Sequence, residues 1–252
     1  MSDLIATART VANTWPALIG ALPEELSALI GVFDEAGYAQ GPNVAIDAAK
    51  ITAKTVEQTI TDLAAAIALE EKFAEAQRRV RSQLARKIIH VAGTAAPEVI
   101  ETLRPKFHGA VSEFADAINA LPNDISSAAL VDAGPSALGA YQNAVAAAQV
   151  ISDIDSWLAS LRDLPAFAGH KPEPLLRVLN PTDHAEIEVL AKAHNASNVD
   201  PQLRRLNPLY IAAVRRGIEF EMHTPTETAK TLQRIESTPL ERNPFGGFAM
   251  SG

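Results

Sequence analysis

Apolar residues recur with heptad spacing in the segment that follows Gly41-Pro42-Asn43. A helix that keeps an apolar repeat of about 3.5 residues presents one seam to a partner helix, so this spacing predicts a coiled-coil-like helix. No Gly or Pro occurs from Val44 to Val91, and we expect one long helix over about 44–92. The members of the seam are separated by alternating steps of four and three residues: Ala49, Ala53, Val56, Ile60, Leu63 and Ile67.

A second apolar stripe follows the short segment Gly93-Thr94-Ala95-Ala96, where we expect a turn. Pro97-Glu98 is typical of a helix start, because proline is tolerated at the first helical position. A short connection between two helices predicts an antiparallel helical hairpin with the end of the long helix. The stripe runs through Pro105 and consists of Ile100, Leu103, Phe107, Val111, Phe114, Ile118 and Leu121. A further helix is expected from Pro135 to about Leu161.

The composition changes near Leu164-Pro165. Residues 1–164 carry 12 Lys+Arg and 20 Asp+Glu, residues 165–252 carry 10 of each, and 9 of the 16 prolines lie in the second part. We therefore predict a helical bundle over 1–164, a small α+β region over 165–237 and an extended tail over 238–252.

Two short segments of the small region have strand-like composition, namely residues 175–179 (LLRVL) and 218–222 (IEFEM). The second alternates apolar and polar residues, which is typical of a half-buried strand. We expect the two to pair. Thr224-Pro225-Thr226-Glu227 is a capping box with proline at the first helical position, and it predicts a helix to about Ser237. The predicted fold class is mainly α: a long helical hairpin or bundle, then a smaller α+β or irregular region with a tail.

The amino-acid composition argues against several classes of function. The chain has no cysteine, which excludes thiolate chemistry and favours a reducing compartment. The formal charge of -8 disfavours nucleic acid as a partner. The start Met1-Ser2-Asp3-Leu4 does not resemble a signal peptide, and no stretch is long and apolar enough for a membrane span. We expect a cytoplasmic protein or part of a particle assembled inside the cell.

Catalytic and cofactor motifs are absent from the sequence. We find no GxSxG, GxGxxG, GxxxxGK[ST] or HExxH pattern, so no catalytic, cofactor-binding or metal-binding residue is predicted. His184 and Glu188 have the i, i+4 spacing of metal ligands, but His194 lies about 80° away on the same helix. We read the histidines as surface or capping residues.

These observations favour a non-enzymatic structural or assembly protein that binds copies of itself or a larger complex. Composition alone would also suit a bacteriophage virion or morphogenesis component. The seam, a basic block and an apolar tail supply the predicted partner-binding residues: Ile60, Leu63, Ile67, Arg78, Arg79, Arg81, Phe245, Phe248 and Met250.

Two alternatives belong to other classes. One is an enzyme or ligand-binding protein with a site at the junction of the helical and C-terminal regions, near His184, His194 and His223. The other is a helical adaptor that binds an acidic partner through the basic face from Arg78 to Lys87. The apolar stripes over 100–121 and 138–161 provide a third possibility, that the seam is filled inside a monomeric bundle.

Overall fold

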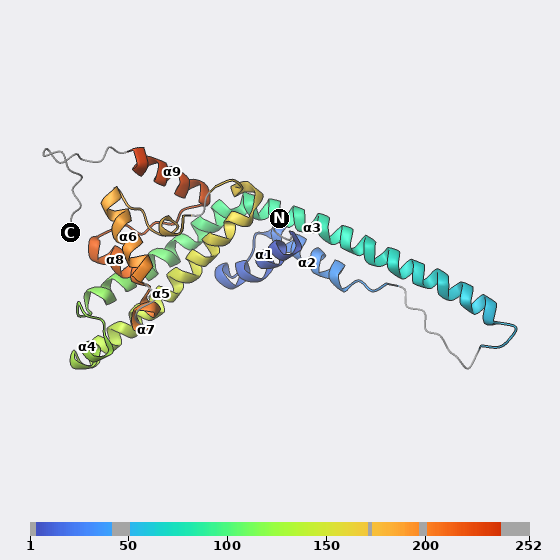
Figure 1. Cartoon of the computed structure of the whole chain (residues 1–252), viewed down its shortest axis with the longest axis horizontal. Coiled ribbons are helices and arrows are strands. Elements are labelled where there is room, and N and C mark those ends of the chain that lie inside the picture. Colours follow the sequence, from blue (N-terminus) through green and yellow to red (C-terminus); the bar gives the residue numbers. More distant parts are fainter. Residues whose placement is uncertain (1–3, 42–50, 171–172, 197–200, 238–252) are drawn as a thin grey trace. The chain divides into compact units, whose positions relative to one another are not determined.

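The computed structural model describes residues 4–41, 51–170, 173–196 and 201–237 (Figure 1). The structure is 81% helical, and none of these residues forms a strand. The predicted mainly-α fold class is therefore confirmed. The chain divides into two compact units, Met1–Ala95 and Ala96–Gly252, and each is described by itself.

The first unit contains α1 (Leu4–Ile19), α2 (Glu24–Tyr38) and the beginning of α3 (Val56–Asn119). Helix α2 begins after Pro23 with two glutamates in its first turn, where carboxylates stabilise the positive end of the helix dipole. The buried side chains of the two short helices form their inner faces: Ala8, Val11, Trp15, Leu26 and Phe33.

Helix α3 differs from the prediction at both ends. It begins at Val56 after a turn over 53–55, and the rest of the expected start, 44–50, lies outside the described residues. The predicted turn at 93–96 and the antiparallel hairpin are wrong, because α3 continues through Pro97 and Pro105 to Asn119. A proline inside a helix costs about 3 kcal/mol. One buried stripe runs through the proline without a break and offsets this cost: Ile88, Ala92, Ala96, Val99, Leu103 and Phe107.

The second unit is built on the last part of α3 and on α5 (Pro135–Ser160), which lie side by side and line a common groove. The predicted helix from Pro135 is confirmed, with Gly134 at the N-cap and proline at the first position. The remaining elements follow in this order: α4 (Ser127–Asp132) before α5, then η2 (Leu161–Asp163), η3 (Pro165–Phe167), η4 (Pro174–Leu176), α6 (His184–Ala196), α7 (Pro201–Leu206), α8 (Pro208–Arg216) and α9 (Pro225–Ser237). The composition change near Leu164 lies inside this unit.

The two predicted strands are wrong as strands, but their segments do lie side by side. A single antiparallel bridge joins Asn180 to Glu219, and Glu221 N donates to Val178 O at 3.1 Å. Pro174 begins the 3₁₀ turn η4, and Pro181 follows the bridge. Because proline cannot donate to a ladder, only a few residues between the two prolines are free to pair.

The capping box is confirmed. Thr224 N donates to Glu227 Oε2 at 2.8 Å, and Glu227 N donates in return to Thr224 Oγ1 at 3.3 Å, at the start of α9. The two bonds satisfy two of the backbone donors that every helix leaves unpaired at its first turn.

An aromatic cluster joins the helices of the second unit. The Phe114 ring of α3 meets Tyr210 of α8 edge-on, with centroids 6.2 Å apart, and Tyr210 meets Phe220 at 6.0 Å. Phe114 and Tyr210 are completely buried. Edge-to-face contacts of this kind add about 0.5–1.5 kcal/mol to the burial of the rings.

We expect Phe114→Ala to lower the free energy of unfolding by about 3–5 kcal/mol, because it removes a buried ring and leaves a cavity. Urea denaturation followed by circular dichroism measures the change. Phe114→Leu keeps most of the volume and should lose clearly less. A loss below about 1 kcal/mol for Phe114→Ala would contradict the tight packing of this cluster.

Candidate functional site

The first candidate site is the arm of α3, which we define as residues 56–92 in the first unit. Helix α2 is fixed to one side of this arm. Gln77 Nε2 donates to Ala36 O and to Ala39 O, both at 2.9 Å, and so satisfies carbonyls at the end of α2. The Arg81 guanidinium lies 4.6 Å from the centre of the Phe33 ring, in a cation–π contact.

Four of the six predicted seam residues lie on the arm, on the N-terminal side of this contact; Ala53 lies in the turn before α3, and Ala49 lies outside the described residues. We call Val56, Ile60, Leu63 and Ile67 the first stripe. Ile60 is 62% exposed and Ile67 is 49% exposed, while Leu63 is half-buried. Ile60 and Ile67 are therefore open to solvent within the described part of the chain.

Exposed apolar side chains are concentrated in the first unit. Eleven large apolar side chains are exposed among the described residues, and nine of them belong to this unit. Contiguous exposed apolar surface is uncommon on a protein that works alone, and it marks an interaction site. Five of the nine lie on the arm: Val56, Ile60, Ile67, Leu69 and Val80.

The structure separates the three predicted basic residues. Arg78 Nη2 and Arg79 Nε donate to the Glu75 carboxylate at 2.5 and 2.6 Å, and both arginines are largely exposed. The bond from Arg79 and the charge of Arg78 lower the pKa of Glu75. Arg81 instead lies half-buried against Phe33, so it does not share an open basic face with the other two.

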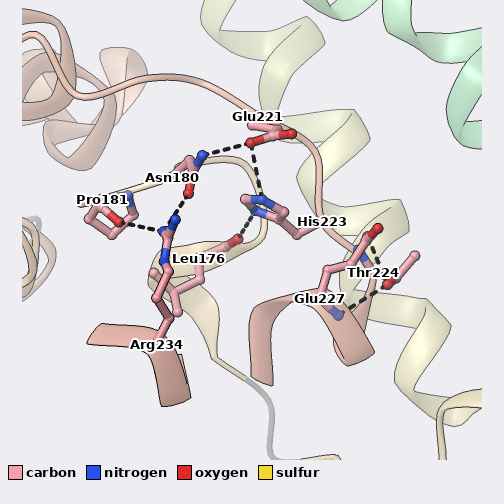
Figure 2. Close-up of polar contacts among 8 residues, drawn as sticks. All are labelled: Leu176, Asn180, Pro181, Glu221, His223, Thr224, Glu227 and Arg234. Carbon is pink, nitrogen blue, oxygen red and sulfur yellow. Dashed lines mark hydrogen bonds and ion pairs between the residues drawn. The ribbon is translucent and has the colours of Figure 1, made fainter. Parts of the chain in front are cut away.

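The second candidate site is a polar network in the second unit (Figure 2). His223 is buried, and its two ring nitrogens face two acceptors: Nδ1 lies 2.8 Å from Leu176 O, and Nε2 lies 3.4 Å from Glu221 Oε2. Asn180 Nδ2 donates to the same Glu221 oxygen at 2.7 Å, and Arg234 of α9 donates to Asn180 Oδ1 at 3.1 Å. The network joins η4, the bridge segment and α9.

An ion pair lies beside this network. Arg177 donates to the two oxygens of Asp155 at 2.6 and 2.9 Å, and both side chains are largely buried. Burial alone would lower the pKa of Arg177, but the hydrogen bond and the charge of Asp155 raise it above the usual value. Burial also raises the pKa of Tyr210, which keeps the phenol neutral. These groups hold the segment after η4 against α5.

The cavity beside His223 is too small for a substrate. It has a volume of about 20 Å³, which is room for one water molecule, and Arg177, His223 and Thr228 are among its lining residues. His184 lies half-buried on α6 and His194 is exposed there. No group of three or more His, Asp or Glu side chains in the described part of the chain is placed to hold a metal ion.

A larger groove of about 740 Å³ lies between α3 and α5, and sequence reasoning did not predict it. Small side chains, Glu113 and Asp116 line it. In the sequence, the alanines of this region indicate only that helices can approach closely, and no pattern there predicts a groove. The groove offers two carboxylates, the hydroxyl of Ser136 and the amide of Asn143.

Three predicted site residues, Phe245, Phe248 and Met250, lie outside the described residues. Their role stays a prediction.

Comparisons with protein families, with curated proteins and with solved structures found no match to this chain. Over the residues described, no helix is long and apolar enough to cross a membrane.

We expect the Arg177–Asp155 pair to stabilise the second unit. Asp155→Asn leaves the guanidinium largely buried without its counter-charge, and the free energy of unfolding should fall by about 2–3 kcal/mol. A double-mutant cycle with Arg177→Met measures the coupling, which we expect to be about 1–2 kcal/mol. The exposed pair Lys192–Glu188, whose Nζ–Oε1 distance is 3.0 Å, is a matched control and should couple by less than about 0.5 kcal/mol. Equal coupling in the two cycles would contradict a special role for the buried pair.

Proposed function

We propose that this chain is a non-enzymatic assembly protein that associates with copies of itself through the arm of α3. The observation that carries the proposal is the exposed apolar surface of the arm. Its apolar side chains have the heptad spacing of a helix–helix seam, and yet they face solvent in the single chain.

The energy of covering this surface supports association. Full burial of one Ile or Val side chain stabilises by about 1.5–3 kcal/mol, and the side chains of the first stripe are about half exposed. The stripe therefore offers roughly 3–5 kcal/mol per chain, before the loss of translational and rotational freedom is counted. Two chains that bury it together gain twice this amount, roughly 6–10 kcal/mol, and this gain acts against an association cost of about 4–15 kcal/mol.

The polar sites do not support the two alternative functions, an enzyme or ligand-binding protein and a helical adaptor. The His223 network joins segments of the second unit through side-chain and carbonyl contacts and has room for one water, as expected of a structural connection between segments. The basic block is divided between Glu75 and Phe33, which weakens the adaptor alternative.

Other parts of the proposal follow from the sequence alone. We propose that the tail with Phe245, Phe248 and Met250 attaches the chain to a second protein surface, and that the chain works inside the cell or in a particle assembled there. A bacteriophage virion or morphogenesis component is the class that its composition suits.

We expect the protein to form a defined oligomer that Ile60→Glu with Ile67→Glu disrupts, because the variant places two charges in the seam. Light scattering and sedimentation velocity over a range of concentrations measure the mass. The dissociation constant should rise at least about 100-fold, which corresponds to about 2.7 kcal/mol. Far-UV circular dichroism shows whether the helix is retained.

A matched control carries the same two charges on another side of the helix. Thr61→Glu with Ala68→Glu has the same spacing and alters two exposed residues. This variant should change the dissociation constant by less than about 3-fold. A wild-type chain that is monomeric at every concentration would overturn the proposal, and so would equal effects of the two double variants.

A further inference from the structure

A second apolar stripe lies on the arm, with the spacing of the first. We call Leu69, Phe73, Ala76 and Val80 the second stripe. Each member lies thirteen residues after a member of the first stripe, so the two stripes are roughly 140° apart around the helix axis. Leu69 is 54% exposed, Val80 is 51% exposed and Ala76 is exposed, so this stripe too is open to solvent.

Helix α2 does not cover the second stripe. It is held to the arm through Gln77 and Arg81, and Gln77 borders the stripe, about 40° around the helix from Phe73 and about 60° from Val80. Ala76 and Val80 nevertheless remain exposed, while Gly41 lies against the edge of the Phe73 ring. The first unit therefore leaves room beside α2 for another helix.

We propose that the second stripe is the seam of an antiparallel pair of α3 arms from two copies of the chain. The proposal rests on the proposed function, because it names the partner and the geometry of the same arm. Contacts of the first stripe then join such pairs into the larger oligomer, and Ile60→Glu with Ile67→Glu disrupts this larger oligomer while the antiparallel pair remains. An antiparallel seam needs a register in which the facing positions of the two copies complement each other.

One antiparallel register satisfies the apolar positions. When Leu69 faces Val80 of the second copy, Phe73 faces Ala76, so that a large ring meets a small side chain. The two-fold symmetry repeats both contacts, and the seam then has four apolar layers in its centre. A parallel register would instead set Phe73 against Phe73 and Ala76 against Ala76, leaving one layer crowded and the next one loose.

The charges select the same register independently. Heptad steps of three and then four residues extend the second stripe through Ala66 to Asp62 on one side, and through the exposed Gln83 to Lys87 on the other. In the antiparallel register Asp62 faces Lys87 of the second copy at both ends of the seam. A parallel register would set Asp62 against Asp62 and Lys87 against Lys87, which disfavours it. The packing of the apolar side chains and the charges therefore favour the same antiparallel register.

One flank of this seam brings like charges together, because Lys72 faces Arg79 of the second copy. Arg79 is already bonded to Glu75 of its own helix at 2.6 Å, and Arg79 and Arg78 together lower the pKa of Glu75. The carboxylate of Glu75 therefore lies beside Arg79 at the edge of the seam, and its negative charge offsets the repulsion between Arg79 and Lys72 of the second copy. Exposed pairs of this kind contribute little in either direction, so the central layers decide the register.

Cysteine cross-linking tests the arrangement, because the chain has no native cysteine. In the double variant Leu69→Cys with Val80→Cys, each new thiol faces a thiol of the second copy. Within one chain the two positions lie about 16 Å apart along the helix, too far for a disulfide, whose Cα atoms are at most about 7 Å apart. We expect a disulfide-linked dimer on a non-reducing gel, at least about tenfold more abundant than with either single variant.

A control pair separates the seam from chance collisions. Glu71→Cys with Arg78→Cys has the same register but lies on the opposite face of the helix, so it should form little dimer. A single Leu69→Cys variant that cross-links as well as the double variant would show a parallel pair and overturn the proposal. Equal cross-linking by the control pair would also overturn it.

Sedimentation of the reduced double variant separates this proposal from the proposed function. If the reduced protein is an oligomer that does not cross-link on oxidation, self-association stands and the antiparallel seam is overturned. If both the reduced double variant and the wild-type chain are monomeric at every concentration, the proposed function fails as well.

Discussion

The structure depends on the unbroken burial of one face of α3 across Gly93 and Pro97. A proline in a helix removes a hydrogen bond and pushes against the preceding turn, at about 3 kcal/mol. Val99, Ile100 and Leu103 follow directly on the buried face, and each stabilises by about 1.5–3 kcal/mol when it leaves water. A turn at 93–96 would move these side chains off the stripe that Ile88 and Ala92 begin. Keeping the stripe therefore outweighs the local cost, and α3 contributes to both units as one helix.

The competition between local helix signals and the burial of apolar side chains explains which parts of the fold could be predicted from the sequence. Features set by neighbouring residues were confirmed, such as the capping box of Thr224 and Glu227 and the helix that Pro135 begins. The start signal at Pro97 was as good a local pattern as the one at Pro135, and yet it failed. The difference lies in what surrounds each proline: Pro135 follows Gly134, whose positive φ interrupts a helix, whereas Pro97 follows a stretch that is already helical. Local rules identify where a helix is able to start, and long-range burial decides whether it does.

For the candidate site too, the sequence predicted what depends on local spacing and missed what depends on contacts between distant residues. Heptad spacing alone identified Ile60 and Ile67, and their exposure makes them candidates for binding. The heptad spacing could not show that Arg81 lies over Phe33 or that Gln77 caps α2, since these contacts join residues that are about forty to fifty positions apart. Those two contacts decide which side of the arm α2 occupies. These contacts leave Leu69, Ala76 and Val80 exposed, which the spacing of the second stripe in the sequence could not show.

A helix with two exposed apolar stripes constrains the kind of assembly it can join. A neighbouring helix covers one stripe, because the buried seam of a helix pair occupies only part of the circumference. Two stripes about 140° apart therefore require two neighbours at different sides of the arm. If the second stripe pairs with a second copy, the first stripe remains at the outer end of that pair and presents Ile60 and Ile67 to a further helix. The arm is thus suited to a bundle of several chains rather than to an isolated pair, and an assembly of that kind would cover the apolar surface that the single chain leaves in water.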